Sequence, residues 1–234
     1  MKKVFYLIAL VLSANCAIAQ TGYGPEIGLG FSTMHFAPNL LYTSASTSAI
    51  FSGKIGGNVD LKMNQHLYAQ IGIFVSRKGQ TRSFSYDSSN SNNEYDKQTL
   101  TINYFDLPLN LLYKTGKQGQ GRFFVGLGVT ASYIIGGKNK ITSTGVYNDT
   151  AYSLSGSTKV VAGNPVAGFD LGINFIAGYE LPTGLFFKAY YTLGGNDIGL
   201  GTEIDKNRMG GISIGYFFGK GRDINKEEDL IEKD

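Results

Sequence analysis

The sequence predicts an all-β protein, an eight-stranded antiparallel up-and-down transmembrane β-barrel with short periplasmic turns and long extracellular loops. Three observations predict it: apolar and polar residues alternate with period two, short and long connections alternate between these segments, and the N-terminus resembles an export signal. Residues 169–181 show the alternation most clearly, with apolar odd positions and Asp, Gly, Asn or Glu at most even positions. Only a strand places every second residue on one side. An apolar outer face and a polar inner face suit a barrel in lipid.

Residues 1–19 are predicted to be a cleaved signal peptide. Lys2 and Lys3 form the positive start, Val4 to Leu12 the apolar stretch, and Ala17 to Ala19 an A-x-A-like cleavage site. The apolar stretch is too short to span a bilayer. Cys16 leaves lipid attachment as an alternative, although Asn rather than a small residue precedes it. Cleavage after residue 19 would leave no cysteine, and therefore no disulfide, in the mature chain.

The alternating segments give eight expected strands. They are expected at residues 25–34, 51–63, from 67 onward, up to 114 through the segment 104–114, and at 122–135, 169–181, 185–193 and 210–218. Three of the connections are short (63–66, 115–121 and 182–184), and four are long and rich in Ser, Asn, Gly and Thr (36–50, 79–98, 136–167 and 194–207). In outer-membrane barrels the short turns face the periplasm and the long loops face outside.

The 136–167 connection contains a candidate hairpin, residues 138–144 with 151–160, which is too polar to face lipid. We expect it to project above the membrane, with a ten-stranded barrel as the alternative. A soluble β-sandwich is a further alternative that explains the alternation alone. The barrel domain is assigned to residues 20–218 and a charged periplasmic tail to residues 219–234.

Outward aromatic residues are expected to form two girdles at the membrane interfaces. Those near the short turns are Tyr113, Phe123, Tyr179, Phe187 and Phe218, and those near the long loops are Phe31, Phe51, Phe105, Tyr133, Phe169 and Tyr191. Since the chain contains no Trp, Phe and Tyr must form both girdles.

Polar residues on the opposite face are expected to fill the barrel interior. This predicted network consists of Glu26, Lys54, Asp60, Lys62, Asp106, Asn110, Lys114, Asp170, Asn174, Glu180 and Lys188. An eight-stranded barrel has an interior just wide enough for side chains, and charges buried there must be paired. We therefore expect a plugged lumen, with a proton or ion path as the alternative.

The sequence predicts no enzyme. The two histidines are His35, near the outer rim, and His66, in a tight turn, and no acidic residue accompanies His35 on its lipid-facing side. Catalytic, cofactor and metal sites are therefore expected to be absent, although an outer-membrane lipid-acting enzyme stays open as an alternative. The charge is nearly balanced once residues 1–19 are removed, which gives no reason to expect nucleic acid as a partner.

The segment Tyr104-Phe105-Asp106-Leu107-Pro108-Leu109 resembles the aromatic–x–acidic–[IL]-Pro-Leu strand of the PorT-like outer-membrane β-barrel family of the Bacteroidota, whose members are usually described as outer-membrane β-barrel or porin family proteins. Gly28-Leu29-Gly30, Gly126-Leu127-Gly128 and the Gly-Tyr-Phe-Phe that ends at Phe218 also fit, so the resemblance covers essentially the whole mature chain. It implies a location in the cell outer membrane and a role either as a structural or surface-binding barrel or in a protein-secretion or envelope assembly. The implied partners are outer-membrane lipid and an unidentified periplasmic or surface protein.

One departure from outer-membrane proteins is the charged tail that follows Phe218, where many of them end in Phe. The tail is too short and too charged to bury a core, so it is expected to be solvated or to dock a periplasmic partner.

Overall fold

The computed structural model consists of strands whose bounds follow the alternating segments but extend beyond them. It describes residues 22–36, 44–86, 94–117, 119–147, 150–162, 165–166, 168–197 and 205–218. The strands are β1 (Gly22–Phe36), β2 (Ser44–Lys62), β3 (Leu67–Tyr86), β4 (Glu94–Lys114), β5 (Arg122–Tyr147), β6 (Thr150–Ala162), β7 (Pro165–Val166), β8 (Phe169–Glu180), β9 (Leu185–Gly194) and β10 (Asp205–Tyr216). None of the described residues forms a helix that could cross a membrane.

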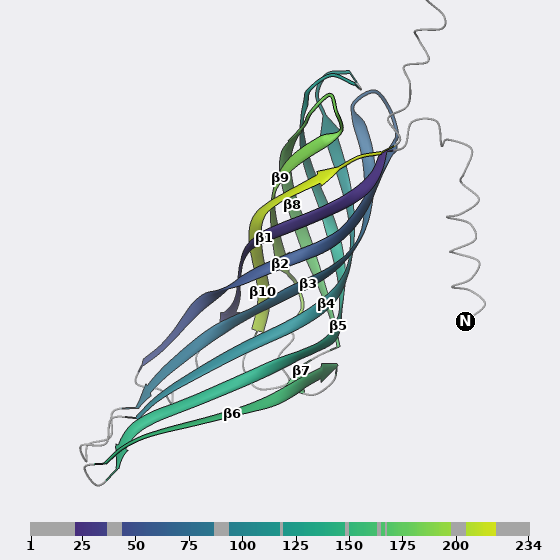
Figure 1. Cartoon of the computed structure of the whole chain (residues 1–234). Helices are drawn as coiled ribbons and strands as arrows, with labels where there is room; N and C mark the ends of the chain where they lie inside the picture. The colour runs from purple at the N-terminus through teal and green to yellow at the C-terminus, as the bar shows by residue number, and fades with distance from the viewer. Residues whose placement is uncertain are drawn as a thin grey trace, which may run out of the picture.

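Eight of these strands close into an antiparallel ring. The pairing runs β1-β2-β3-β4-β5-β8-β9-β10 and returns from β10 to β1 (Figure 1). β6 pairs with β5 on one side and, in parallel, with the two-residue β7, so it lies outside the ring. The expected eight-stranded up-and-down barrel is therefore confirmed.

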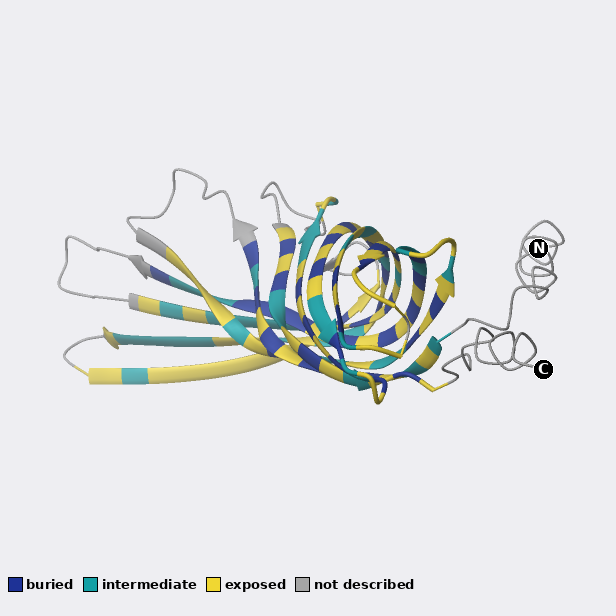
Figure 2. Ribbon diagram, turned by 90° about the horizontal axis from the view of Figure 1, so that it is seen from above, coloured by how far each residue is buried: buried dark blue, intermediate teal, exposed yellow. Residues whose placement is uncertain are grey.

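Burial alternates along the ring strands as the pattern predicted. In β8 every odd residue from Phe169 to Ala177 is exposed, and the even residues from Asp170 to Ile176 are buried (Figure 2). The exposed side is strongly apolar, with Leu109 51% and Ile212 71% exposed. Since this face cannot be solvated favourably by water, it is the lipid-facing surface of the barrel.

The long connections are shorter than predicted, because the strands extend into them. β3 and β4 run through most of the expected loop 79–98, and β2 begins at Ser44 within the expected loop 36–50. The last ring strand begins at Asp205 rather than at residue 210. Serine, threonine and glycine in these segments suggested loops, but cross-strand pairing outweighs such weak local preferences.

The expected hairpin is present: β5 continues from the ring into its first strand, and β6 forms its second strand. β5 has 26 residues, whereas a tilted transmembrane strand needs about 9–11. Together with parts of β2, β3, β4 and β6, its distal half forms a sheet that projects sideways from the ring (Figures 1 and 2). We call this sheet the extension; it comprises residues 44–50, 77–86, 94–103, 136–147 and 150–160.

Two glycines occupy positions that other residues could not fill, one at a close approach between ring strands and one in a tight turn. A Cβ atom added to Gly30 would lie 2.1 Å from the carbonyl oxygen of Gly210. Gly184 has φ of +96° in the short turn between β8 and β9, where its N–H donates to the Leu181 carbonyl at 3.0 Å. The first position requires absence of a side chain, and the second requires a backbone conformation that glycine favours.

Candidate functional site: the filled lumen

The inner face of the ring carries large apolar side chains as well as charges. Three buried apolar clusters lie along it and at its junction with the extension: Met34, Ile102, Tyr104, Ile134 and Val160; Tyr68, Leu112, Ile176, Tyr190 and Met209; and Phe124, Phe186 and Phe217. Most of these aromatic and aliphatic residues were not expected in the lumen. These residues have the same inward parity as the charged residues. They were not predicted to point inward because apolar residues were expected on the lipid-facing side.

A first charged group lies near the short turns. The Lys114 Nζ is 2.5 Å from Asp60 Oδ2 and 2.9 Å from Glu180 Oε2. Arg122 binds Glu180 with Nη2 to Oε1 at 3.0 Å and donates from Nη1 to the Tyr68 hydroxyl at 2.8 Å. These groups are nearly inaccessible to water, so each removed partner would leave a buried charge uncompensated.

A second group surrounds Glu26, whose side chain is completely buried. Lys54 Nζ lies 3.0 Å from Oε1, and Lys188 Nζ lies 2.5 Å from Oε2. The Asn58 amide also donates to this carboxylate. Lys54 Nζ is 4.0 Å from the centre of the Tyr190 ring, so the aromatic face contributes to holding the second of two cations on one carboxylate.

A third group lies toward the long-loop end. Lys78 Nζ lies 3.0 Å from Asp106 Oδ1, and Ser76 Oγ donates to Asp106 Oδ2 at 2.5 Å. The carboxylate of Asp170 accepts from the Asn207 amide at 2.9 Å, and Asn207 also donates to the Tyr104 hydroxyl at 2.9 Å. Both acids in this group are thus hydrogen-bonded within the lumen.

Amide side chains connect the levels of the lumen. Asn174 donates to Asn110 Oδ1 at 3.1 Å and to Thr130 at 2.5 Å, and Asn110 donates to Gln70 at 3.4 Å. Gln70 in turn donates to Asp60 at 2.8 Å. The three groups contain five carboxylates and five cations, namely Glu26, Asp60, Asp106, Asp170 and Glu180 with Lys54, Lys78, Lys114, Arg122 and Lys188.

Little open space remains among these side chains. One cavity among them has a volume of about 40 Å³ and is bordered by Lys54, Asp106, Asn174 and Tyr190. A buried water needs at least about 10–15 Å³ by this measure, so the cavity holds a few waters at most.

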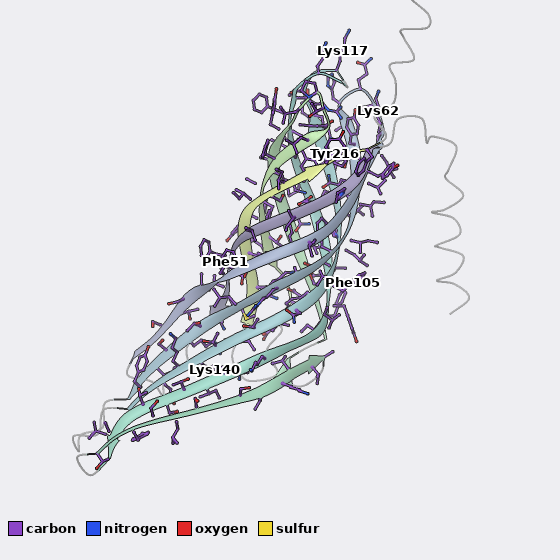
Figure 3. The ribbon with its side chains drawn as sticks, viewed as in Figure 1. Phe51, Lys62, Phe105, Lys117, Lys140 and Tyr216 are labelled. Carbon is purple, nitrogen blue, oxygen red and sulfur yellow. The ribbon has the colours of Figure 1, made fainter. Side chains whose placement is uncertain are left out.

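The structure brings together most of the predicted network and adds members to it. Nine predicted residues are buried, and Lys54 and Lys62 are half-buried: Glu26, Asp60, Asp106, Asn110, Lys114, Asp170, Asn174, Glu180 and Lys188 are the buried ones. Lys62 lies at the short-turn rim (Figure 3).

Sequence reasoning missed Lys78, Arg122 and Asn207. Asn207 was missed because the last strand was expected to begin only at residue 210, and Lys78 because it lies at the start of the expected loop 79–98, although the parity of both strands places these residues inward. Arg122 is two residues before the inward Phe124, so the parity of its own strand would have identified it.

The predicted girdle residues lie on the outer face. All are exposed except Tyr179, which is half-buried: Phe31, Phe51, Phe105, Tyr113, Phe123, Tyr133, Phe169, Phe187, Tyr191 and Phe218 are the exposed ones. Several touch across strands, including Phe31 with Phe51 and Phe123 with Tyr179, whose ring centres lie 6.1 Å and 4.7 Å apart. Phe218 follows the last strand and pairs with Tyr23 as an isolated bridge, so the eighth ring strand ends at Tyr216 rather than Phe218.

The candidate histidines do not form a shared site with their neighbours. His66 is in the short turn, where Nδ1 lies 3.0 Å from the Lys114 carbonyl oxygen and the ring stacks on Tyr113. The His35 side chain lies outside the described residues. Ser32, a neighbour of His35 in β1, is buried inside the ring, with Oγ 2.6 Å from the Ser52 hydroxyl. Within the described side chains, no group of three His, Cys, Asp or Glu residues is arranged to hold a metal.

A closed antiparallel ring with an apolar outer face and a charged, filled interior defines the class of transmembrane β-barrels. The family model described as outer membrane protein beta-barrel domain matches residues 18–199, most of the chain, and the protein belongs to that family. It is therefore a protein of the outer membrane.

Several solved outer-membrane proteins are similar to this chain. They are the attachment invasion locus protein Ail of Yersinia pestis (TM-score 0.38, 15% identity, covering 85% of this chain and 99% of Ail), Neisserial surface protein A (0.39, 7%, 84% and 97%) and OprG from Pseudomonas aeruginosa (0.37, 11%, 84% and 97%). No curated protein matches the sequence significantly.

Proposed function

We propose that this protein is a non-enzymatic integral outer-membrane barrel that acts as a structural or surface-binding protein. Its lumen forms no continuous pore for water or ions. The observation that carries the proposal is the filled lumen. Five buried carboxylates and five cations sit among three apolar clusters at successive levels of one narrow ring. Opening the lumen would separate these paired charges, and leaving a charge unpaired costs several kcal/mol, so the closed lumen is favoured.

The remaining assignments belong to the same proposal. Residues 1–19 direct export and are cleaved, residues 20–218 form the barrel domain, and residues 219–234 form a periplasmic tail. Under this orientation the short turns at residues 63–66, 115–121 and 182–184 lie in the periplasm, and the extension lies outside the cell. The partners are outer-membrane lipid and a surface or periplasmic protein that the tail or the extension would contact.

Two alternatives are less well supported. A role in a protein-secretion or envelope assembly rests on the resemblance to the PorT-like family, whose most specific motif here is the segment 104–109. A lipid-acting enzyme would need a nucleophile and an acid beside His35 on the lipid-facing side. Ser32 faces the lumen, where its hydroxyl is bonded to Ser52 and to the Gly79 carbonyl, so it does not serve that chemistry.

Planar-bilayer recording of the purified, refolded protein tests the proposal. We expect no steady conductance from the natural sequence. A double variant, Lys54→Ala with Tyr190→Ala, enlarges the interior cavity that these residues border and serves as the comparison for a widened lumen. Steady, size-selective conductance from the natural protein would refute the closed lumen.

A further inference from the structure

The outward face of the extension is strongly basic, in contrast to the apolar outward face of the ring. Five exposed cations lie on it, and they are Arg77, Lys97, Lys138, Lys140 and Lys159. We call these residues the basic face. The register puts their side chains on one side, because residues directly opposite in an antiparallel pair point the same way: Arg77 pairs with Asn103, Lys97 with Thr142, Thr101 with Lys138, and Lys138 with Lys159.

No carboxylate compensates these charges at the outward positions whose side chains the structure describes. Asp96 lies on the opposite side, since its neighbours Tyr95 and Lys97 occupy the outward positions of β4. Lys138 and Lys159 are directly opposite each other, an arrangement of like charges that destabilises a strand pair. Lys140 stands two residues from Lys138 on the same side. A face that accumulates uncompensated cations in this way is suited to bind an anion.

Three of these cations line a groove. It measures about 470 Å³ and is lined by Arg77, Lys138 and Lys140 together with Thr99, Thr101, Asn103 and Gly137. Cations with neutral hydrogen-bonding groups between them are the donors that a phosphorylated sugar requires. No large aliphatic or aromatic side chain lines the groove, so it is better suited to a polar headgroup than to an acyl chain.

The groove lies just above the outer aromatic girdle. Arg77 is two residues beyond Val75, the partner of Phe105, and Lys138 is opposite Thr101, four residues beyond Phe105. With about 3.4 Å per residue and a strand tilt of about 40°, Arg77 and Lys138 stand about 5–10 Å above the girdle, and Lys140, opposite Thr99, lies one residue pair farther out. Aromatic girdles mark the interface with the lipid headgroups. Figure 3 places Lys140 beyond Phe51 and Phe105, at the end opposite Lys117.

The extension also lies over lipid rather than over the lumen. Viewed from above in Figure 2, its strands extend well to one side of the ring. An anion that reaches the basic face must therefore belong to the surface of the surrounding bilayer or approach from above it. In an outer membrane, the outer leaflet is composed of glycolipid whose sugar headgroup carries phosphates.

We propose that the groove on the basic face binds the phosphorylated sugar headgroup of an outer-leaflet glycolipid. The cations contact the phosphates, and Thr99, Thr101 and Asn103 contact the sugar hydroxyls. The bound lipid removes the repulsion between Lys138 and Lys159 and holds the extension against the membrane surface. This inference rests on the orientation given in the proposed function, but it does not depend on the lumen being closed.

Lipid binding by the purified full-length barrel in detergent micelles, followed by native mass spectrometry, tests the inference. The probes are bisphosphorylated lipid A and dephosphorylated lipid A with the same acyl chains. We expect the natural protein to retain the phosphorylated form preferentially. The double variant Lys138→Gln with Lys140→Gln should bind it at least about tenfold more weakly, since each basic residue near an anionic surface contributes about 1 kcal/mol.

Lys117→Gln is the control, because Lys117 is an exposed lysine in a short turn at the opposite end of the barrel. Its affinity should match that of the natural protein. Unchanged gel mobility before and after heating will establish that the variants are folded. Equal binding of the two lipids, no loss in the double variant, or an equal loss in Lys117→Gln would each overturn the inference. Displacement by inorganic phosphate at a similar concentration would show a simple phosphate site rather than a headgroup site. Bilayer conductance by the natural protein would refute the closed lumen and leave this result unaffected.

Discussion

The ring and the extension are made of the same strands but are built for different surroundings. In β5 the outward residues of the ring are Val125, Leu127 and Val129, whereas those of the extension include Lys138 and Lys140. The charges of the lumen point inward and are paired or hydrogen-bonded, whereas the cations of the basic face point outward, and no acid at the described outward positions of the extension compensates them. The strands therefore continue from the ring into the extension, with register shifts between Ala49 and Gly53 and at Asn103/Tyr104, and the character of their outward side chains changes there. Four predictions test this contrast, from the largest expected effect to the smallest.

The largest difference is expected for glycines. Gly30→Val places a Cβ 2.1 Å from a backbone carbonyl oxygen of the neighbouring ring strand, whereas Gly156→Val in β6 meets nothing within 4 Å. Overpacking normally costs about 1–3 kcal/mol, and a clash with paired backbone on both sides should exceed about 3 kcal/mol. We expect Gly30→Val to give no heat-modifiable folded band in liposomes and Gly156→Val to fold normally. Similar folding yields would show that the ring is not closely packed at this position.

The second prediction concerns the charge in the lumen. Glu26→Gln leaves Lys54 and Lys188 without their shared carboxylate and should lower the free energy of unfolding by about 3–5 kcal/mol. Lys97→Gln, which removes an exposed charge in the extension, should change it by less than about 0.5 kcal/mol. Urea titration of the protein in liposomes measures both. A small effect of Glu26→Gln would mean that water reaches this carboxylate.

The third prediction compares two exposed leucines. Leu109 in the ring is 51% exposed and Leu154 in the extension is 67% exposed, so burial within the protein does not distinguish them. Leu109→Arg should cost about 2–4 kcal/mol because it places a charge in hydrocarbon, whereas Leu154→Arg meets water. Ile173→Arg should behave as Leu109→Arg does. If Asn110→Ala, an inward change, were as costly in the folding assay as Leu109→Arg, the assignment of the two faces would be wrong.

The smallest effect is expected when the extension is shortened. Ile141 is paired with Gly156, so residues 141–156 can be replaced by Asn-Gly, a favourable two-residue turn between Lys140 and Ser157. All pairings among the ring strands β5, β8, β9, β10 and β1 remain. The free energy of unfolding should therefore change by about 0.5 kcal/mol or less. Loss of membrane insertion in this variant would mean that the extension takes part in assembly of the ring.

The sequence alone predicted the features that depend on local alternation. Period two identifies the inward position of Glu180 and the outward position of Phe123 whatever the partner strand is, because successive side chains of a strand point to opposite sides. The charge and size of those residues then indicate lipid outside and a polar interior. It also predicted that residues 138–144 and 151–160 are too polar for the bilayer and form a projecting hairpin.

Only the tertiary structure decided which side chains meet and where the strands end. Lys114 bridges Asp60 and Glu180, which are separated from it by 54 and 66 residues, and this requires the register of β2, β4 and β8 around the closed ring. Alternation fixes the face of a residue but leaves the shift between strands undetermined, and each shift of two residues would select different ion pairs. The extension was decided in the same way. Its Ser-, Gly- and Asn-containing segments have little preference for strand on their own, and they form strands because β2 to β5 continue from the ring and β6 pairs with β5.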